Sequence, residues 1–160
     1  MFEEKKSKKY LTPQQALLKA QTYCAYQERS QQEVRNKLYE WGLYAEVVEE
    51  TISKLVTDNF LNEERFAVAF AGGKFRIKKW GRVKIKIELK KKKTSEYCIR
   101  NALSMITDKD YIQTLKKVLN EKSKQVKEKN AIKRNYKIGQ HAISKGFEPD
   151  LVWDILRIET

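Results

Sequence analysis

Residues 30–42 read SQQEVRNKLYEWG, and the order of residue types in this stretch predicts one short helix with its own start and stop. Ser30 and Glu33 have the spacing of a capping box, in which each side chain accepts a hydrogen bond from the backbone amide of the other residue. Gly42 stands where glycine commonly ends a helix. The apolar side chains between these ends recur every three or four residues and therefore share one face: Val34, Leu38 and Trp41.

Helices are also predicted on both sides of this stretch. Before it, Thr12 and Gln15 form a second capping box, Pro13 occupies the first helical position, and the helix should run to about Glu28. After it, apolar residues at helical spacing predict a third helix: Val47, Val48, Ile52 and Leu55. Only 6 Gly and 2 Pro occur among the 160 residues, so helix formers dominate the chain.

The pattern of this three-helix unit returns twice, first after 51 residues and again after a further 53, with Gly146 in the place of Gly42. In the order first, second and third copy, the matching positions are Val34, Ile85 and Ile138; Leu38, Leu89 and Ala142; Val47, Cys98 and Leu151; Val48, Ile99 and Val152; Ile52, Leu103 and Leu156. A fixed period of this length is typical of repeat proteins. We therefore predict an all-α fold of three tandem three-helix repeats, each like a helix-turn-helix unit, at 12–58, 59–107 and 108–160, after a basic tail at 1–11.

Two local signals bear on this fold. Residues 83–87 read VKIKI, which alternates with period two and taken alone would indicate a strand, but the repeat places this stretch in a helix with a broad apolar face. Thr107 and Asp110 resemble a capping box for a long helix starting near Tyr111. That helix should continue past Val126, because no Gly or Pro interrupts it.

The charge of the chain is large and segregated. The 34 Lys and Arg exceed the 21 Asp and Glu by 13, and an excess of this size destabilises a compact protein unless an anionic partner is present. Residues 74–93 hold eleven bases against Glu88, residues 122–137 hold seven against Glu128, and residues 46–64 hold six acids against Lys54. A solvated helix face would explain a run of mixed sign, whereas runs this one-sided favour binding to phosphates.

The candidate site follows from this charge. The bases are mostly lysines at irregular spacing, which suits contact with the phosphate backbone rather than readout of base sequence. Trp80 and Phe75 lie among them and would either stack on exposed bases or pack in the core, and packing is the commoner role. The candidate nucleic-acid or filament contacts are Lys74, Arg76, Lys78, Lys79, Arg82, Lys84, Lys86, Lys90, Lys124, Lys127, Lys133, Arg134 and Lys137.

Other functional classes find little support in the sequence. His141 is the only histidine and lies among apolar helical positions, so we expect a structural role for it, and no phosphate-cradling loop or hydrolase motif appears. Cys24 and Cys98 lack metal or redox spacing and are expected to be reduced core residues. We therefore predict a protein that is not an enzyme and needs no metal or cofactor.

The location of the protein is a separate prediction. The first five residues lack the pattern of a signal peptide and no apolar run is long enough to cross a membrane, so a cytoplasmic location is expected.

Three stretches together are specific enough to suggest a family: residues 26–38 (YQERSQQEVRNKL), 59–67 (NFLNEERFA) and 80–89 (WGRVKIKIEL). In these motifs the chain resembles the RecX family of regulatory proteins, and the resemblance extends from about Ala16 over nearly the whole sequence. Lys92-Lys93 departs from the Lys-Gly turn that the family commonly has after this helix. Asn62-Glu63 replaces the usual Asp pair, and the third repeat matches only loosely.

The resemblance implies an elongated, curved array of repeats that binds the RecA filament on single-stranded DNA and restrains its recombination, ATPase and coprotease activities in DNA repair and the SOS response. We expect the chain itself to be a monomer. The family's filament-contacting residues form no short motif that transfers to this chain, so the candidate site rests on charge. Two alternatives remain: a sequence-nonspecific nucleic-acid-binding protein that acts without RecA, and an adaptor whose basic face meets an acidic protein.

Overall fold

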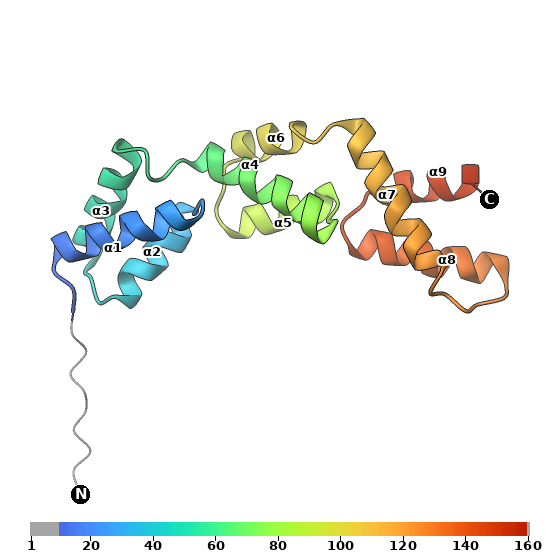
Figure 1. The fold of residues 1–160 in the computed structure, drawn as a ribbon, viewed down its shortest axis with the longest axis horizontal. Helices are drawn as coiled ribbons and strands as arrows, with labels where there is room; N and C mark the ends of the chain where they lie inside the picture. Colours follow the sequence, from blue (N-terminus) through green and yellow to red (C-terminus); the bar gives the residue numbers. More distant parts are fainter. Residues whose placement is uncertain (1–9, 160) are drawn as a thin grey trace, which may run out of the picture. The chain divides into compact units, whose positions relative to one another are not determined.

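The structure is a computed structural model and describes residues 10–159. The described residues form nine α-helices and one short π-helical segment, with no strand among them (Figure 1). This confirms the predicted all-helical fold. Most of the predicted basic tail, with Lys5, Lys6, Lys8 and Lys9, lies outside the described residues. The chain divides after Phe66 into two compact units, which are described separately below.

The first unit contains three helices: α1 (Pro13–Tyr26), α2 (Gln31–Glu40) and α3 (Ala45–Thr57). Both predicted capping boxes are present. The Thr12 hydroxyl accepts from the Gln15 amide at 3.2 Å while the Gln15 side chain accepts from the Thr12 amide at 3.0 Å. Ser30 and Glu33 make the same reciprocal pair at 3.0 and 3.1 Å. Each pair satisfies two amides that the first turn of a helix otherwise leaves without partners.

The core of this unit lies between the three helices and is built from the predicted apolar positions. Val34, Leu38 and Val48 are fully buried, and Cys24 lies beside them in the same cluster. Burial raises the pKa of the Cys24 thiol to about 11, with smaller opposing effects from nearby charges, so the thiol stays protonated at neutral pH. The prediction of Cys24 as a core residue is therefore confirmed.

The family motif at residues 59–67 ends α3 and starts the next helix. Asn59 adopts the left-handed conformation at φ 63°, and the Phe60 amide donates back to the Leu55 carbonyl at 2.8 Å. The Asn62 side chain accepts from the Arg65 amide at 2.8 Å and so caps α4 (Glu63–Gly73). The Arg65 guanidinium donates to the Asn59 carbonyl at 3.0 Å and pairs with Glu28 on the chain between α1 and α2. The motif therefore stabilises a turn and a helix cap.

The second unit contains most of α4, the π-helical segment η1 (Lys74–Lys78), α5 (Arg82–Lys91) and α6 (Glu96–Ser104). Residues 83–87 are helical, as the repeat predicted, so the period-two alternation does not mark a strand. Ile85 and Leu89 are fully buried, whereas Val83 and Ile87 are 42% and 49% exposed. The apolar face of α5 is thus narrower than predicted, because only one i,i+4 pair reaches the core.

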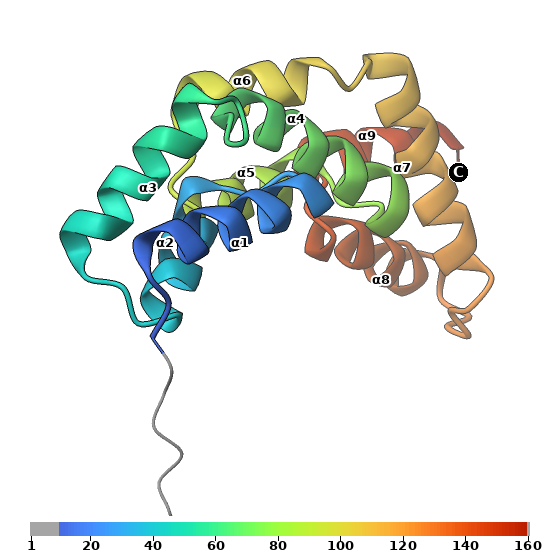
Figure 2. The same ribbon diagram turned by 60° about the vertical axis from the view of Figure 1, so that its left-hand side comes forward.

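The rest of the second unit is formed by α7 (Asp108–Ser123), α8 (Ala131–Ser144) and α9 (Pro149–Glu159), in which α7 packs against α8 and α8 against α9 (Figure 2). The prediction that the helix from Tyr111 continues past Val126 is wrong, because α7 ends at Ser123. The Arg134 guanidinium from α8 donates to the backbone carbonyls of Ser123 and Val126. These contacts satisfy carbonyls at the end of α7 and hold residues 124–130 as a loop.

The same turn follows the central helix of each predicted repeat. Gly42, Lys93 and Gly146 all have positive φ, at 86°, 59° and 98°. The next residue donates its amide to a carbonyl five residues earlier in all three turns, at 3.2, 3.1 and 3.2 Å, in the pairs Leu43 to Leu38, Thr94 to Leu89 and Phe147 to Ala142. The turns are 51 and 53 residues apart, as the sequence spacing requires. The residue limits of the repeats stay a prediction.

Candidate nucleic-acid interface

The most basic segment, residues 74–93, begins in η1 and continues through α5. The widened turn of η1 ends at Lys79, which adopts the left-handed conformation at φ 54°, and the Trp80 amide donates to the Lys74 carbonyl at 3.2 Å. Gly81 then starts α5 without a side-chain cap. Trp80 lies between the two elements, and a lysine from each, Lys74 of η1 and Lys84 of α5, lies against its ring.

One group of these bases surrounds two aromatic rings, and we call it the lysine–aromatic cluster: Phe70, Lys74, Trp80, Lys84 and Lys92. The Trp80 ring has the Lys74 ammonium 5.1 Å and the Lys84 ammonium 4.6 Å from its centroid. The Phe70 ring has Lys74 at 5.5 Å and Lys92 at 5.6 Å, and the two rings meet edge to face at 6.4 Å. All five residues lie in the second unit, and all five side chains are half-buried. The cluster combines positive charge with aromatic surface, as single-strand-binding surfaces do.

The two aromatic residues considered from the sequence therefore have different positions. Phe75 is 6% exposed and stacks on the Tyr111 ring at 5.9 Å, which makes it a core residue. Trp80 is half-buried and borders the lysines.

Arg82 is tied into the fold by several contacts. Its guanidinium pairs with Asp108 at 2.9 Å and with Glu148 at 3.3 Å, and it lies 3.7 Å from the centre of the Tyr111 ring. The fully buried Tyr111 accepts from the Arg82 amide at 3.0 Å and donates to Glu148. Burial raises the pKa of Tyr111, and the hydrogen bond to Glu148 raises it further. Arg82 thus links the start of α5 to α7 and to the chain before α9.

Other candidate bases are also paired. Lys79 pairs with Glu121 at 3.1 Å, Lys90 with Glu96 at 3.2 Å and Lys137 with Glu128 at 3.5 Å, while Arg134 is held by backbone carbonyls. Lys86 is half-buried near Glu96. The remaining candidates have exposed side chains, in η1, just after α7, in the loop before α8 or in α8: Arg76, Lys78, Lys124, Lys127 and Lys133.

Sequence reasoning missed a second basic group. Lys122 and Lys145 lie with Lys78 and Lys79 around a hollow that His141 also lines. Lys122 belongs to a basic run, but Lys145 lies outside both runs and was not a candidate. The signal was the i,i+4 spacing of His141 and Lys145, which places both on one face of α8.

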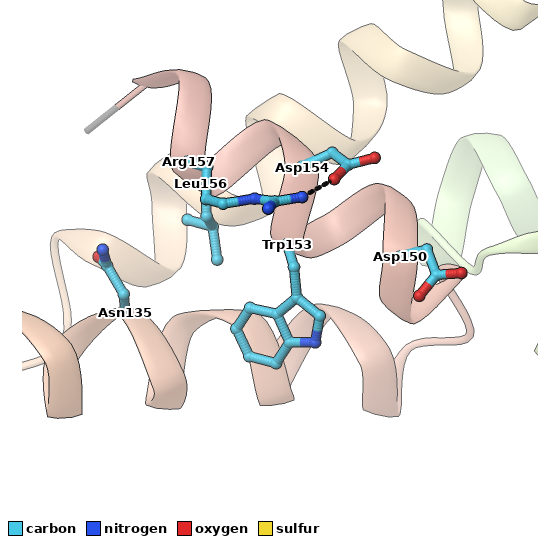
Figure 3. Close-up of a pocket in the computed structure, with 6 residues that line it drawn as sticks. All are labelled: Asn135, Asp150, Trp153, Asp154, Leu156 and Arg157. Carbon is cyan, nitrogen blue, oxygen red and sulfur yellow. Dashed lines mark hydrogen bonds and ion pairs between the residues drawn. The ribbon is translucent and has the colours of Figure 1, made fainter.

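A larger hollow of about 630 Å³ lies along α8 and α9 and has a different character. In Figure 3 the Trp153 indole points toward α8, and Asp154 pairs with Arg157 beside it, while Asp150 lies apart. Trp153 packs over Gly139, where a Cβ would lie 2.2 Å from the indole, and stacks on Tyr136. Two carboxylates at its edge make this hollow unfavourable for phosphate.

Two classes of site are not found in the described part of the chain. Among the described side chains, those of residues 10–158, no three His, Cys, Asp or Glu are grouped to hold a metal ion. No described helix is both long and apolar enough to cross a membrane.

The fold and the charged surface together define an all-helical protein of three-helix units. Two family models match the chain: "RecX, first three-helix domain" over residues 16–55 and "RecX, second three-helix domain" over residues 62–103. Together they cover more than half of the sequence. The chain belongs to the RecX family of regulatory proteins.

Individual relatives agree with this assignment. The chain is 24% identical to "Regulatory protein RecX" of Bacillus cereus (strain AH820) and 26% identical to that of Bacillus cytotoxicus, in each case over 139 residues that make up 87% of this chain. The match covers 52% of each relative, so the chain spans about half the length of these curated proteins.

Two solved structures are similar in fold. The crystal structure of RecX from Lactobacillus salivarius matches with a TM-score of 0.81 and 24% identity, and the match covers 92% of this chain and 95% of that one. A second crystal structure of regulatory protein RecX matches with a TM-score of 0.78 and 22% identity, covering 91% of this chain and 73% of that one.

Proposed function

We propose that this chain inhibits the RecA recombinase by binding the RecA filament on single-stranded DNA through its basic surface. The observation that carries the proposal is the lysine–aromatic cluster, in which three ammonium groups border two aromatic rings. Phosphates of a single strand would meet the ammonium groups, and an unstacked base would meet the Trp80 ring. Membership of a family of regulatory proteins supports a role in regulation rather than catalysis.

The proposed mechanism divides the surface by charge. The cluster and the exposed bases of η1, of the loop after α7 and of α8 would lie along the DNA-bearing groove of the filament, and the acidic segment 46–64 would meet protein. Lysine contacts to phosphate position a protein without reading sequence, so binding should not depend on the base sequence. Restraint of recombination, ATPase and coprotease activity would follow from occupation of the groove.

The test replaces the three cluster lysines by glutamine, as Lys74→Gln, Lys84→Gln and Lys92→Gln together. Each substitution removes a charge and keeps a side chain of similar length. The triple variant should lose most of its inhibition of RecA ATPase and strand exchange, with helicity unchanged. The matched control carries Lys54→Gln, Lys109→Gln and Lys117→Gln, which removes the same charge at exposed positions elsewhere. Equal loss of inhibition in both triple variants would contradict the cluster assignment.

The structure changes which bases suit such a test. From charge alone, reversal of Arg76, Lys79, Arg82 and Lys86 to Glu is expected to abolish inhibition with stability intact. Arg82→Glu would instead place a third carboxylate against Asp108 and Glu148, and Lys79→Glu would face Glu121. Since like charges at these distances destabilise the fold, that variant confuses binding with folding.

A second candidate function is binding of bare nucleic acid without RecA, which the same cluster would support. The two functions differ in the concentration at which the protein acts. A regulator of the filament should inhibit RecA at concentrations far below those that coat naked single strands, as measured by ATPase inhibition and by fluorescence anisotropy of labelled DNA. Inhibition only at coating concentrations would favour the DNA-binding alternative. An adaptor that meets an acidic protein would neither inhibit RecA nor bind the labelled DNA.

A further inference from the structure

The basic hollow lies wholly within the second unit, and three elements form it. Lys78 and Lys79 lie at the end of η1 and just after it, Glu121 and Lys122 lie in α7, and His141 and Lys145 lie in the last turn of α8 and just after it. Its volume is about 290 Å³. Liquid water occupies about 30 Å³ per molecule, so the hollow has room for a phosphate or diphosphate group.

Positive charge in this hollow exceeds what the fold neutralises. Four lysines face one glutamate, which leaves three net positive charges when His141 is neutral. Burial lowers the pKa of Lys145, and the positive charges of Lys79, Lys84 and Lys78 lower it further, against an opposing effect of Glu121. Burial also lowers the pKa of His141, followed by the charges of Lys122 and Lys145. Burial is the larger cause of both shifts, and the like charges of the lysines add to it; a bound anion would offset that repulsion.

We propose that this hollow is a binding site for a phosphate group, held by Lys78, Lys79, Lys122 and Lys145, with His141 as an additional donor when it is protonated. The chemistry suits phosphate oxygens with negative charge, which a DNA strand would supply as a row of singly charged phosphodiesters and a free nucleotide as a multiply charged terminal group. The site goes beyond the proposed function, because nothing in its geometry requires RecA.

Glu121 occupies the hollow in place of the ligand. Its carboxylate accepts from the Lys79 ammonium at 3.1 and 3.3 Å, and that hydrogen bond and the charges of Lys79, Lys117 and Lys124 lower the pKa of Glu121. A bound phosphate would compete with this carboxylate for Lys79. The site therefore predicts that Glu121→Gln tightens phosphate binding, an effect that misfolding would not produce.

A ligand here would also join parts of the second unit. The four lysines lie in or directly after η1, α7 and α8, so one bound anion would hold the ends of these three elements together. Any ligand that binds the folded state alone raises the melting temperature as its concentration increases. Pyrophosphate should therefore stabilise the protein more than chloride does at equal ionic strength.

The test uses the full chain and inorganic pyrophosphate at pH 7. His141 is the only histidine, so its imidazole proton resonances report on the hollow without assignment. Pyrophosphate should shift them toward the protonated form in a saturable manner. Lys122→Gln and Lys145→Gln should each weaken binding about tenfold, as expected for loss of one charged hydrogen bond. Glu121→Gln should tighten it, and the control Lys109→Gln should leave it unchanged.

Two outcomes would overturn the proposal. One is a His141 response that chloride reproduces at equal ionic strength, and the other is equal weakening of pyrophosphate binding by Lys109→Gln, Lys122→Gln and Lys145→Gln.

Competition experiments identify the source of the phosphate. Displacement of pyrophosphate by a short thymidine oligonucleotide assigns the site to DNA, and displacement by a nucleoside triphosphate alone assigns it to a free nucleotide. RecA inhibition is measured separately, so retained inhibition in the cluster triple variant with a normal His141 response would contradict only the proposed function.

Discussion

At the scale of single residues, the repeat explains an unusual backbone conformation. Lys93 has φ 59° at the turn where the other two repeats have Gly42 and Gly146. A side chain with a Cβ pays roughly 1–2 kcal/mol in the left-handed region, whereas glycine does not. Lys93 nevertheless donates its amide to the Lys90 carbonyl at 2.9 Å, so the hydrogen bonding of the turn is intact. Lys93 in the place of glycine therefore raises the conformational energy of this turn, while the backbone geometry of the turn stays the same.

Lys93→Gly should therefore stabilise the protein. Relief of the left-handed strain outweighs the greater chain entropy that glycine loses on folding, and the net gain should be about 0.5–1 kcal/mol. Urea denaturation followed by circular dichroism measures the change. The control is Lys92→Gly at the preceding position, where φ is −86° and glycine offers no relief. Stabilisation by both variants would show that loss of charge, rather than backbone strain, is responsible.

Tyr111 provides a second test at this scale. Its hydroxyl links the Arg82 amide to Glu148 while the ring is fully buried. Tyr111→Phe should cost about 1–3 kcal/mol, because both partners lose a hydrogen bond in a buried setting. Tyr136→Phe, at an exposed ring, should change the free energy of unfolding by less than about 0.5 kcal/mol. Equal effects would mean that solvent replaces the lost bonds at Arg82 and Glu148.

At the scale of helices, what the sequence predicted depends on how far apart the interacting residues lie. The caps at Thr12 and Ser30 involve partners three residues away, and both were predicted. The end of α7 depends on Arg134, which is eight residues from Val126 and eleven from Ser123, and it was missed. Local patterns determine where most helices start, whereas this helix end depends on a side chain from the next helix.

Arg134→Ala should therefore loosen the loop after α7. Its guanidinium holds the carbonyls of Ser123 and Val126, and without it residues 124–130 lose those contacts. Amide hydrogen exchange across 124–130 should become faster, while exchange in the middle of α7 stays slow. Lys133→Ala is the control, because that side chain is exposed on the same helix. Unchanged exchange in the loop would show that residues 124–130 are ordered without Arg134.

The junction between α5 and α8 depends on a close approach of two backbones. The Gly81 amide donates to the Lys145 carbonyl at 2.8 Å, and a Cβ on Gly81 would lie 2.3 Å from backbone atoms of Gly146 and Phe147. Gly81→Ala should destabilise the protein by about 1–3 kcal/mol or more, since backbone cannot yield as a flexible side chain does. Gly73→Ala meets no atom within 4 Å and should stabilise its helix by about 0.5–1 kcal/mol. Thermal unfolding of both variants decides whether the junction is this tight.

At the scale of the whole molecule, the net charge of +13 was evident from the sequence, but its use was not. The most basic run, residues 74–93, contains four of the five residues of the lysine–aromatic cluster and two of the four lysines of the basic hollow. The charge runs did not separate Arg82, whose partners Asp108 and Glu148 are 26 and 66 residues away in the sequence. They also missed Lys145. The role of each basic residue depends on its contacts with residues far away in the sequence, and a count of charges gives no information about those contacts.

The contribution of the cluster to DNA binding should appear in its salt dependence. Each phosphate contact on a single strand adds about 0.7 to the slope of log affinity against log salt, because binding releases a condensed counterion. The triple variant Lys74→Gln, Lys84→Gln and Lys92→Gln should therefore reduce the slope for a thymidine oligonucleotide by about 2. The control triple at Lys54, Lys109 and Lys117 removes the same charge, but diffuse screening gives only a small change in slope. If both variants reduce the slope equally, binding follows total charge, and the cluster is not the surface that meets the phosphates.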